Sequence, residues 1–296
     1  SRLLEIVEKD LNARLRQQEA IAWLGEYAIM STDLYTLFTE AVRLVAETLD
    51  VELVKILQLL PDGKEMLLRA GVGWKEGLVG VAHVGAGSDS HAGYTLLEDE
   101  PVIVSDMRTE NRFRDPHLLL DYGAVSGMSA VIRGRERPWG VLGTHSIRRR
   151  TFTPHDTRFL ISIASILASA IERFRTEYEL RRSRDELAII LNGVSEGVTA
   201  QAPDGSLLYA NNTAARMVGY ASLEELISKS IQEVMEQFDL LDDAGNACAA
   251  TNLPGHQVFQ TKKAVSARVR FCNTRSGEED WLIVDANPIY DADGNV

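Results

Sequence analysis

The sequence predicts an α+β protein of two domains, each an antiparallel sheet flanked by helices, joined by one long helix. The chain has 296 residues, enough for two domains of ordinary size. Segments with the alternating period of strands are paired across turn signals in both halves. Between the halves, residues 158–192 contain neither Pro nor Gly. A helix there can run on the order of 50 Å, because each residue adds 1.5 Å.

Two helices are predicted before the first strand. The second helix follows the cap candidates Ser31, Thr32 and Asp33. The first is defined by apolar residues at helical spacing, and its residues 1–19 are expected to lead into the first domain as a coiled coil. Its apolar positions are Leu4, Val7, Leu11, Leu15, Ile21, Leu24 and Ala28.

Two hairpins and a short strand are predicted in the first domain. The first hairpin turns at Pro61-Asp62-Gly63, and the short strand is "PVIVSD". The second joins "SGMSAVIRG" to "PWGVLGTHS", both largely apolar, as is typical of central strands covered on both faces. The second strand ends with His145 beside Ser146. Successive side chains of a strand point to opposite faces, so this pair does not form a nucleophile and base.

The long helix has a clear start: Thr153 as N-cap, Pro154 at the first helical position and Asp156 three residues after the cap. Spacing of three and four predicts a coiled-coil seam that pairs two copies in parallel. The alternative is a helix that packs its first half on the first domain and frays afterwards. The seam consists of Leu160, Ile163, Leu167, Ile171, Phe174 and Tyr178, and after a phase break at "RRSRDE" resumes at Leu187 and Leu191.

The second half begins with a strand, an Asp-Gly turn, a strand and a helix capped by Asn211 or Asn212. Two longer alternating strands follow, "VSARVRFCNT" and "EDWLIVDANPIY". The last residues, "DADGNV", are a turn signal with no strand after it. We therefore expect this sequence to be a piece of a longer protein, cut inside a hairpin.

Composition excludes several function classes. The net charge of -12 disfavours binding to nucleic acid or anionic membranes. No apolar run approaches the ~20 residues that span a bilayer, and the first residues are charged, unlike a signal peptide. We expect a cytoplasmic segment. Residues 1–247 contain no cysteine, so the first domain has no thiol nucleophile and no thioether-linked cofactor. Cys248 and Cys272 do not form a C-x-x-C pair, and no metal site is expected.

Residues 20–175 resemble a GAF domain, through "AVRLVAETLDVELVKI", "RAGVGW", "GYTLLEDEPVIVSDMRTENRF", "AVSGMSAVI" and the run from "PWGVLGTHS" into the long helix. Residues 193–296 resemble a PAS domain, through "GVTAQAPDGSLLYANNTAARMVGY". The resemblance implies a PAS sheet of five strands whose last strand would begin at about Val296. The PAS-like domain is thus predicted to be truncated before its last strand.

The resemblance implies a sensory input module of a bacterial signal-transduction protein, such as a sensor histidine kinase of a two-component system. Such a module binds a small molecule, dimerises, or does both, and controls an output domain outside this sequence. A diguanylate cyclase or a phosphatase is the alternative output. The alternative of another class is an enzyme acting within these residues, which needs Cys/His or Ser/His/Asp groups that we cannot assemble.

The resemblance also implies where a ligand would bind, with packing alone as the alternative at each position. No covalently attached cofactor is expected, because the bilin-type and flavin-type cysteines are absent, as is the cyclic-nucleotide signature. His256 occupies approximately the region of the haem ligand in haem-binding PAS domains. The ligand-binding candidates are Tyr94, Asp106, Arg112, Phe113, His117 and Tyr122 in the first domain, and Asn212, Phe238, Arg268 and Trp281 in the second.

Overall fold

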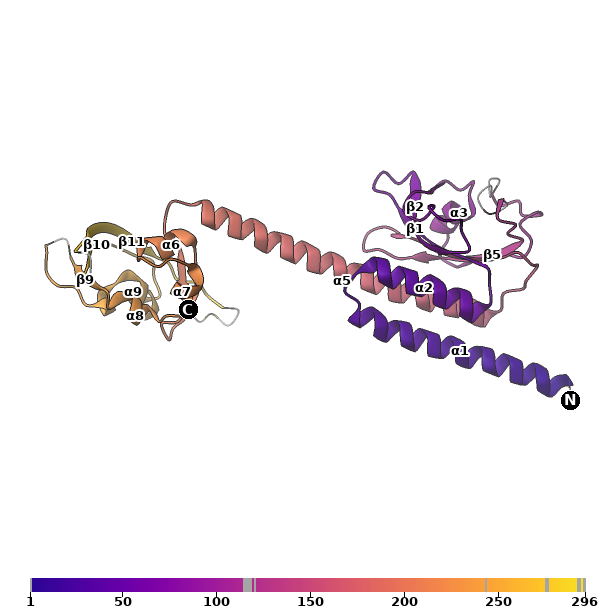
Figure 1. The fold of residues 1–296 in the computed structure, drawn as a ribbon, viewed down its shortest axis with the longest axis horizontal. Helices are drawn as coiled ribbons and strands as arrows, with labels where there is room; N and C mark the ends of the chain where they lie inside the picture. The colour runs from indigo at the N-terminus through magenta and orange to yellow at the C-terminus, as the bar shows by residue number, and fades with distance from the viewer. Residues whose placement is uncertain are drawn as a thin grey trace. The chain divides into compact units, whose positions relative to one another are not determined.

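The computed structural model describes residues 2–113, 119, 121–242, 244–274, 277–291 and 294. The chain divides into two compact units, Ser1–Leu180 and Arg181–Val296, and helix α5 (Pro154–Gly193) crosses the division between them (Figure 1). In the described part of the chain, no helix combines the length and the apolar character needed to cross a membrane.

The first unit is built on an antiparallel sheet, with strands in the order β3-β2-β1-β6-β5-β4. Both predicted hairpins are confirmed, because β1 pairs with β2 and β5 pairs with β6. The closing pair, β1 with β6, brings the two hairpins side by side at the centre of the sheet. The strands are β1 (Leu53–Leu59), β2 (Glu65–Val72), β3 (His83–Gly85), β4 (Val102–Val104), β5 (Ser126–Ile132) and β6 (Gly140–Ser146).

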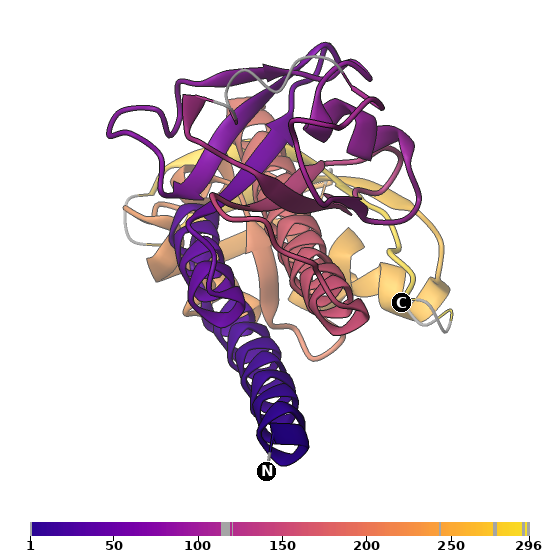
Figure 2. The ribbon, with the colours of Figure 1, turned by 90° about the vertical axis from the view of Figure 1, so that its right-hand side faces the viewer.

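Helices cover both faces of this sheet. Helices α1 (Arg2–Met30), α2 (Leu34–Leu49) and the start of α5 lie on one face, and the short α3 (His91–Leu97) lies on the other (Figures 1 and 2). Local signals fix the helix ends. The Asp33 side chain accepts a hydrogen bond from the Thr36 amide at the start of α2, and Thr153 and Asp156 cap α5 reciprocally.

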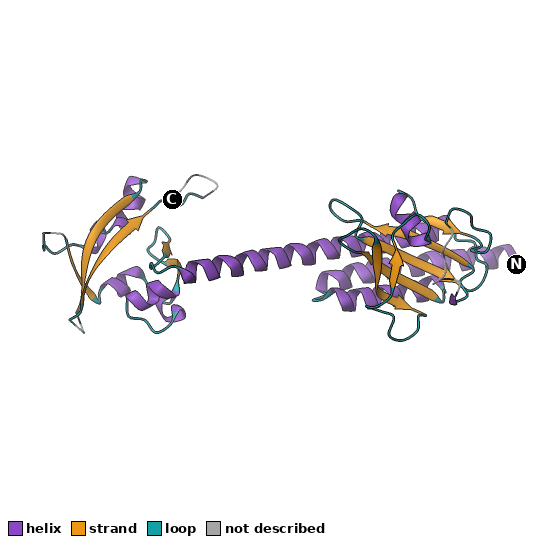
Figure 3. Ribbon diagram, turned by 90° about the horizontal axis from the view of Figure 1, so that it is seen from above, coloured by secondary structure: helices purple, strands orange, loops and turns teal. Residues whose placement is uncertain are grey.

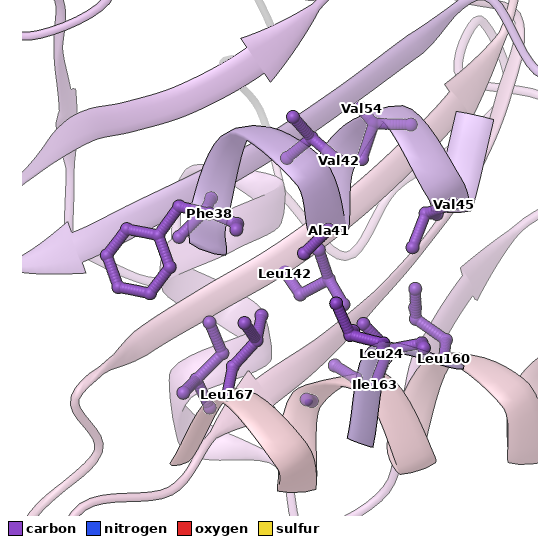
Figure 4. Packing of buried hydrophobic residues seen from close by; sticks show 14 of the residues in the cluster. Leu24, Phe38, Ala41, Val42, Val45, Val54, Leu142, Leu160, Ile163 and Leu167 are labelled. Atoms are coloured by element: carbon purple, nitrogen blue, oxygen red, sulfur yellow. The ribbon is translucent and has the colours of Figure 1, made fainter. Parts of the chain in front are cut away.

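The main core of the first unit lies between the sheet and the three helices (Figure 4). Leu24 of α1, Ala41 of α2 and Leu142 of β6 are all buried there. The first half of the predicted coiled-coil seam belongs to this core as well. Leu160, Ile163, Leu167 and Ile171 are buried inside their own domain, so these positions cannot form a seam with a second copy. On this half, the alternative of packing against the first domain is correct.

Helix α1 also divides differently from the prediction, which placed seven apolar residues on one stripe. Leu24 and Ala28 are buried in the core. The N-terminal half of the helix is exposed. Because an α-helix has 3.6 residues per turn, the apolar residues of this half lie on a different side of the helix from Leu24 and Ala28. The exposed residues are Leu4, Val7, Leu11 and Leu15, which we call the α1 stripe.

The second unit contains two separate sheets in its described residues, β7-β8 and β11-β10-β9 (Figure 3). Asn211 caps the helix after β8. The two predicted long strands are confirmed as an antiparallel pair, β10 and β11. The elements are β7 (Thr199–Gln201), β8 (Leu207–Ala210), α6 (Asn212–Met217), α7 (Leu223–Ile227), α8 (Ile231–Met235), β9 (Phe238–Leu241), a 3-10 helix (Ala250–Asn252), α9 (Pro254–Thr261), β10 (Val265–Asn273) and β11 (Glu279–Ala286).

Candidate functional site

The first unit holds charged and polar side chains inside its sheet, on the face that carries α3. Lys55 of β1, Ser129 of β5 and His145 of β6 lie on this face. His91 of α3 contacts Ser129 and His145. All four side chains are buried, at 0 to 2 % exposure. We call them the interior polar cluster. Such residues are unusual at this depth, because charges and polar groups lose their hydration when they are buried.

Two glycines make room for this cluster. Gly143 is opposite Lys55 in the sheet, and Gly127 is opposite His145. A Cβ atom on Gly143 would lie 3.2 Å from Lys55 Cε and 3.3 Å from His145 Nε2, and one on Gly127 would clash with His145 Nδ1. The lysine and the imidazole therefore converge over Gly143, where a larger residue would push them apart.

Lys55 is the only cluster member that carries a charge in water at neutral pH. Its Nζ lies 5.7 Å from the centre of the Trp74 ring, and the Trp74 indole donates a 2.7 Å hydrogen bond to Val54 O, which holds the ring in place. Among the described residues, no carboxylate forms an ion pair with Lys55. Burial alone lowers the pKa of Lys55 to about 7, because the low-dielectric interior disfavours the ammonium form.

His91 is well bonded. Its Nε2 lies 2.9 Å from Ser129 Oγ and 3.3 Å from Val102 O, and the Ser129 hydroxyl lies 2.6 Å from that of Thr95. The ring stacks on Phe113 at 5.0 Å between centroids. Burial, followed by the charge of Lys55, lowers the pKa of His91 to about 3. The ring is therefore neutral at physiological pH.

His145 is different, because neither of its ring nitrogens has a hydrogen-bond partner among the described residues. Its ring meets that of His91 edge-on, 5.4 Å between centroids. Burial, followed by the charge of Lys55, holds its pKa well below the usual range. A neutral imidazole offers one donor and one acceptor, and leaving both unused in the interior costs about 1–3 kcal/mol per group.

Three of the residues predicted from the GAF resemblance meet beside this cluster. Tyr94 lies 6.1 Å from Phe113 between ring centroids, and the Arg112 guanidinium lies 5.8 Å from the Tyr94 ring. Phe113 is buried and links them to the cluster through its stack on His91. Arg112 already has an acidic partner, because its Nη2 lies 2.6 Å from Glu110 Oε2.

Of the remaining predicted residues of the first unit, Tyr122 packs into the same hydrophobic cluster as Tyr94 and Phe113. Tyr122 packs against Trp74 at 4.8 Å, and its hydroxyl accepts a 3.1 Å hydrogen bond from the Lys75 amide. Asp106 pairs with Arg108 at 2.6 Å within its own turn, and this contact lowers the pKa of Asp106 to about 2. His117 lies outside the described residues.

Sequence reasoning did not single out Lys55 and His91. A usable signal existed for the lysine, which is the one charged residue inside the apolar strand "LVKILQL". His91 gave no such signal, since it stands in a loop-like run, "GSDSHAGY". His145 was singled out, and its expected separation from Ser146 is confirmed. The Ser146 hydroxyl donates a 2.9 Å hydrogen bond to Glu52 Oε2, away from the interior polar cluster.

The second unit has an open hollow of about 650 Å³. Phe238 lines it and meets Phe271 edge-on at 5.7 Å. Cys248 and Cys272 lie on the same hollow, both as free cysteines. Burial, followed by the charge of Glu279, raises the pKa of Cys272, so its thiol is protonated at neutral pH.

The other residues predicted for the second unit do not line this hollow. Arg268 lies over the Trp281 ring at 4.6 Å, and both are exposed on the sheet face opposite the buried Val269 and Phe271. His256 is exposed on α9, and among the described residues no group of three or more His, Cys, Asp or Glu could hold a metal ion.

Asn212 is also exposed, whereas its neighbour Asn211 is completely buried. Asn211 Oδ1 accepts hydrogen bonds from the Val198 and Ala214 amides, at 3.0 and 2.8 Å. Its Nδ2 donates to Leu191 O and Glu196 O, at 2.8 and 2.9 Å. The prediction left the cap open between the two residues, and the structure assigns it to Asn211.

Comparison with known families and structures agrees with this geometry. A family model for the GAF domain matches residues 33–171, and a model for the PAS fold matches residues 185–296. No match of comparable significance was found among curated proteins.

Several solved domains are similar to about half of the chain. The GAF domain from a phosphoenolpyruvate-protein phosphotransferase of Coxiella burnetii is 16% identical with a TM-score of 0.52, covering 56% of this chain and 98% of that one. The GAF domain from the Acinetobacter phosphotransferase is 19% identical with a TM-score of 0.48, covering 55% and 97%. A domain of a putative two-component sensor histidine kinase from Sinorhizobium meliloti is 20% identical with a TM-score of 0.43, covering 51% and 99%.

The Coxiella structure shows that the first unit has the GAF fold, and the family models extend the assignment to both halves. The chain consists of a GAF domain followed by a PAS domain, the two joined by the long helix α5.

Proposed function

We propose that this chain is the cytoplasmic input segment of a bacterial signalling protein, in which the GAF domain binds a small molecule and thereby controls a histidine kinase. The observation that carries the proposal is the interior polar cluster. Among the described residues, the amine of Lys55 has no acidic partner and neither ring nitrogen of His145 has a hydrogen-bond partner. Groups of this kind destabilise a domain unless something binds to them. A ligand would satisfy them.

The proposed role is regulatory rather than catalytic. Ser146, the serine next to His145 in β6, is bonded to Glu52 on the other face of the sheet. Ser129 does lie 2.9 Å from His91, but burial lowers the pKa of His91 to about 3, which makes the ring a weak base for activating a hydroxyl. Residues 1–247 contain no cysteine to act in its place. The side chains of the interior polar cluster can form ionic and hydrogen-bonding contacts, which are suited to holding a ligand.

We also propose that two copies of the chain pair in parallel through their helices. The support is the α1 stripe, whose four apolar residues are 48 to 73% exposed at spacings of three and four. That spacing is the one by which paired helices bury their contact. Apolar residues of α5 beyond the buried part of the seam are exposed as well: Tyr178, Leu180, Leu187, Ile189 and Ile190.

Light scattering on the purified chain tests the pairing. We expect a dimer, and we expect Leu11→Glu to shift it toward monomer by placing a charge in the contact. Asn12→Glu is the matched control, because it adds the same charge to an exposed residue beside the stripe. A monomeric wild type, or equal effects of the two variants, would contradict pairing through α1.

Thermal unfolding with a collection of small molecules tests the sensing. The collection should span anions, neutral compounds and cations. At a 100-fold excess over Kd, a ligand stabilises its domain by about 2.7 kcal/mol, which raises the Tm by roughly 5 °C or more. A collection in which no compound raises the Tm of the GAF domain would count against small-molecule sensing.

A further inference from the structure

The interior polar cluster can carry a positive charge, on Lys55, and this charge favours one class of ligand. Lys55 supplies a buried amine without an acidic partner in the described part of the chain. The nearby guanidinium of Arg112 is already neutralised by Glu110, at 2.6 Å. The group that the interior lacks is therefore an anion, because a buried ammonium is stabilised by an opposite charge held in direct contact.

The second feature is a hydrogen-bonding group next to that charge. His145 Nε2 and Lys55 Cε approach one another over Gly143, since they lie 3.3 and 3.2 Å from the position that a Cβ atom on this residue would take. Both nitrogens of His145 are unbonded among the described residues, and the ring is fully buried. A carboxylate has two oxygens, so it can accept one hydrogen bond from Lys55 Nζ and another from the protonated nitrogen of a neutral His145.

The third feature is the apolar surroundings of the cluster. Trp74 lies against Lys55, and Phe113 lies against His91. Tyr94 packs beside Phe113. Aromatic rings favour an apolar or aromatic body on a ligand over a polyhydroxylated one.

We infer that the GAF domain takes a small carboxylate with an aromatic or otherwise apolar body, whose carboxylate pairs with Lys55 and accepts a hydrogen bond from His145. This inference rests on the proposed sensing function and specifies its ligand class. It also predicts a proton linkage. The amine of Lys55 is mostly neutral above its pKa of about 7, and a carboxylate bound to it favours the ammonium form. Binding at pH 8 therefore takes up nearly one proton per ligand.

The experiment is calorimetry on the full chain at pH 8, in two buffers that differ in ionisation enthalpy. The probes are a matched series: benzoate, benzamide and benzylamine, then phenylacetate and phenylacetamide. We expect binding of the carboxylates only, with proton uptake. Lys55→Met should weaken carboxylate binding at least tenfold and abolish the uptake. This variant is expected to fold, because a methionine of similar length replaces a buried amine.

Lys75→Met is the matched control, because Lys75 also lies near an aromatic ring, 6.0 Å from that of Tyr122, but is exposed. It should bind benzoate like the wild type. His145→Phe gives a second measurement, since it removes the hydrogen bond and keeps the charge. We expect weaker binding with proton uptake retained.

Other binding results would overturn the inference about the ligand without deciding the sensing function. If benzamide or benzylamine binds as well as benzoate, or if Lys55→Met binds benzoate unchanged, the anion inference is overturned while small-molecule sensing stands. If no member of the series binds, the carboxylate class is overturned. The larger collection used for thermal unfolding then decides separately whether the sensing function fails as well.

Discussion

The Gln17 amide of α1 donates a 2.7 Å hydrogen bond to Asp156 in the first turn of α5, and both side chains are buried. The other carboxylate oxygen of Asp156 accepts a 2.9 Å hydrogen bond from the Thr153 amide. One carboxylate thus begins α5 and fixes α1 against it. This contact joins two helices through residues that are 139 positions apart in the sequence.

Gln17→Met tests the contact, because it leaves a buried carboxylate oxygen without its donor. We expect the free energy of unfolding of the GAF domain to fall by about 1–3 kcal/mol, measured by urea denaturation. Gln18→Met is the control, since Gln18 is exposed, and it should change the stability by less than about 0.5 kcal/mol. Equal losses in the two variants would show that the hydrogen bond does not stabilise the domain.

Arg173 of α5 closes the other end of α1. Its Nη2 donates to Ala28 O at 2.9 Å and to Ser31 O at 3.1 Å, carbonyls that the helix end leaves unsatisfied. Arg173→Met should cost about 1–2 kcal/mol of stability. Arg175→Met is matched in chemistry, but the ion pair of Arg175 with Glu179 is exposed, so its loss should stay below about 1 kcal/mol. Thermal unfolding of both variants compares the two arginines. A larger loss of stability for Arg175→Met would contradict the capping of α1 by Arg173.

Lys55 makes the stability of the GAF domain depend on pH. Its pKa is lowered to about 7 in the folded state from 10.5, so between these values the unfolded chain binds more protons than the folded one. Stability therefore rises with pH in this window, by up to about 1.3 kcal/mol per pH unit. The groups that face Lys55 are His91 and His145, which are neutral throughout the window. The rise therefore comes from the lysine.

Lys55→Met should lack this rise, so that its stability advantage over the wild type is largest at about pH 7 and shrinks toward pH 10. Urea denaturation at intervals of one pH unit measures it. Lys75→Met should follow the wild type. Parallel curves for Lys55→Met and the wild type would mean that the amine is not buried in solution.

Asn211 holds the beginning of the PAS domain together. Its side chain forms four hydrogen bonds, including the one to Leu191 O near the end of α5. Asn211→Ala should lower the stability of this domain by about 2 kcal/mol or more. Asn212→Ala should have little effect, because the Asn212 side chain is exposed. Hydrogen exchange of peptides from residues 194–242 would report the difference, and similar exchange in both variants would contradict the assignment.

The sequence by itself determined the elements that depend on neighbours along the chain. The cap at Thr153, the turn at Pro61-Asp62-Gly63 and the alternation of β10 and β11 act over a few residues, so their patterns are readable. The first cap was narrowed to three residues, of which the structure uses Asp33. The GAF and PAS resemblances placed both domains. They gave six candidates for a pocket in the first domain, and the structure brings Tyr94, Arg112 and Phe113 of these together.

Only the tertiary structure decided between two arrangements that have the same sequence pattern. Spacing of three and four at Leu160 and Ile163 serves a seam between two chains as well as it serves a core, and the burial of these residues against α1 and α2 decides for the core. The interior polar cluster has the same origin. Lys55, His91 and His145 are brought together by the pairing of β1 with β6 and by the packing of α3 on β5. Contacts between residues so far apart leave no local pattern, because each depends on where the rest of the chain lies.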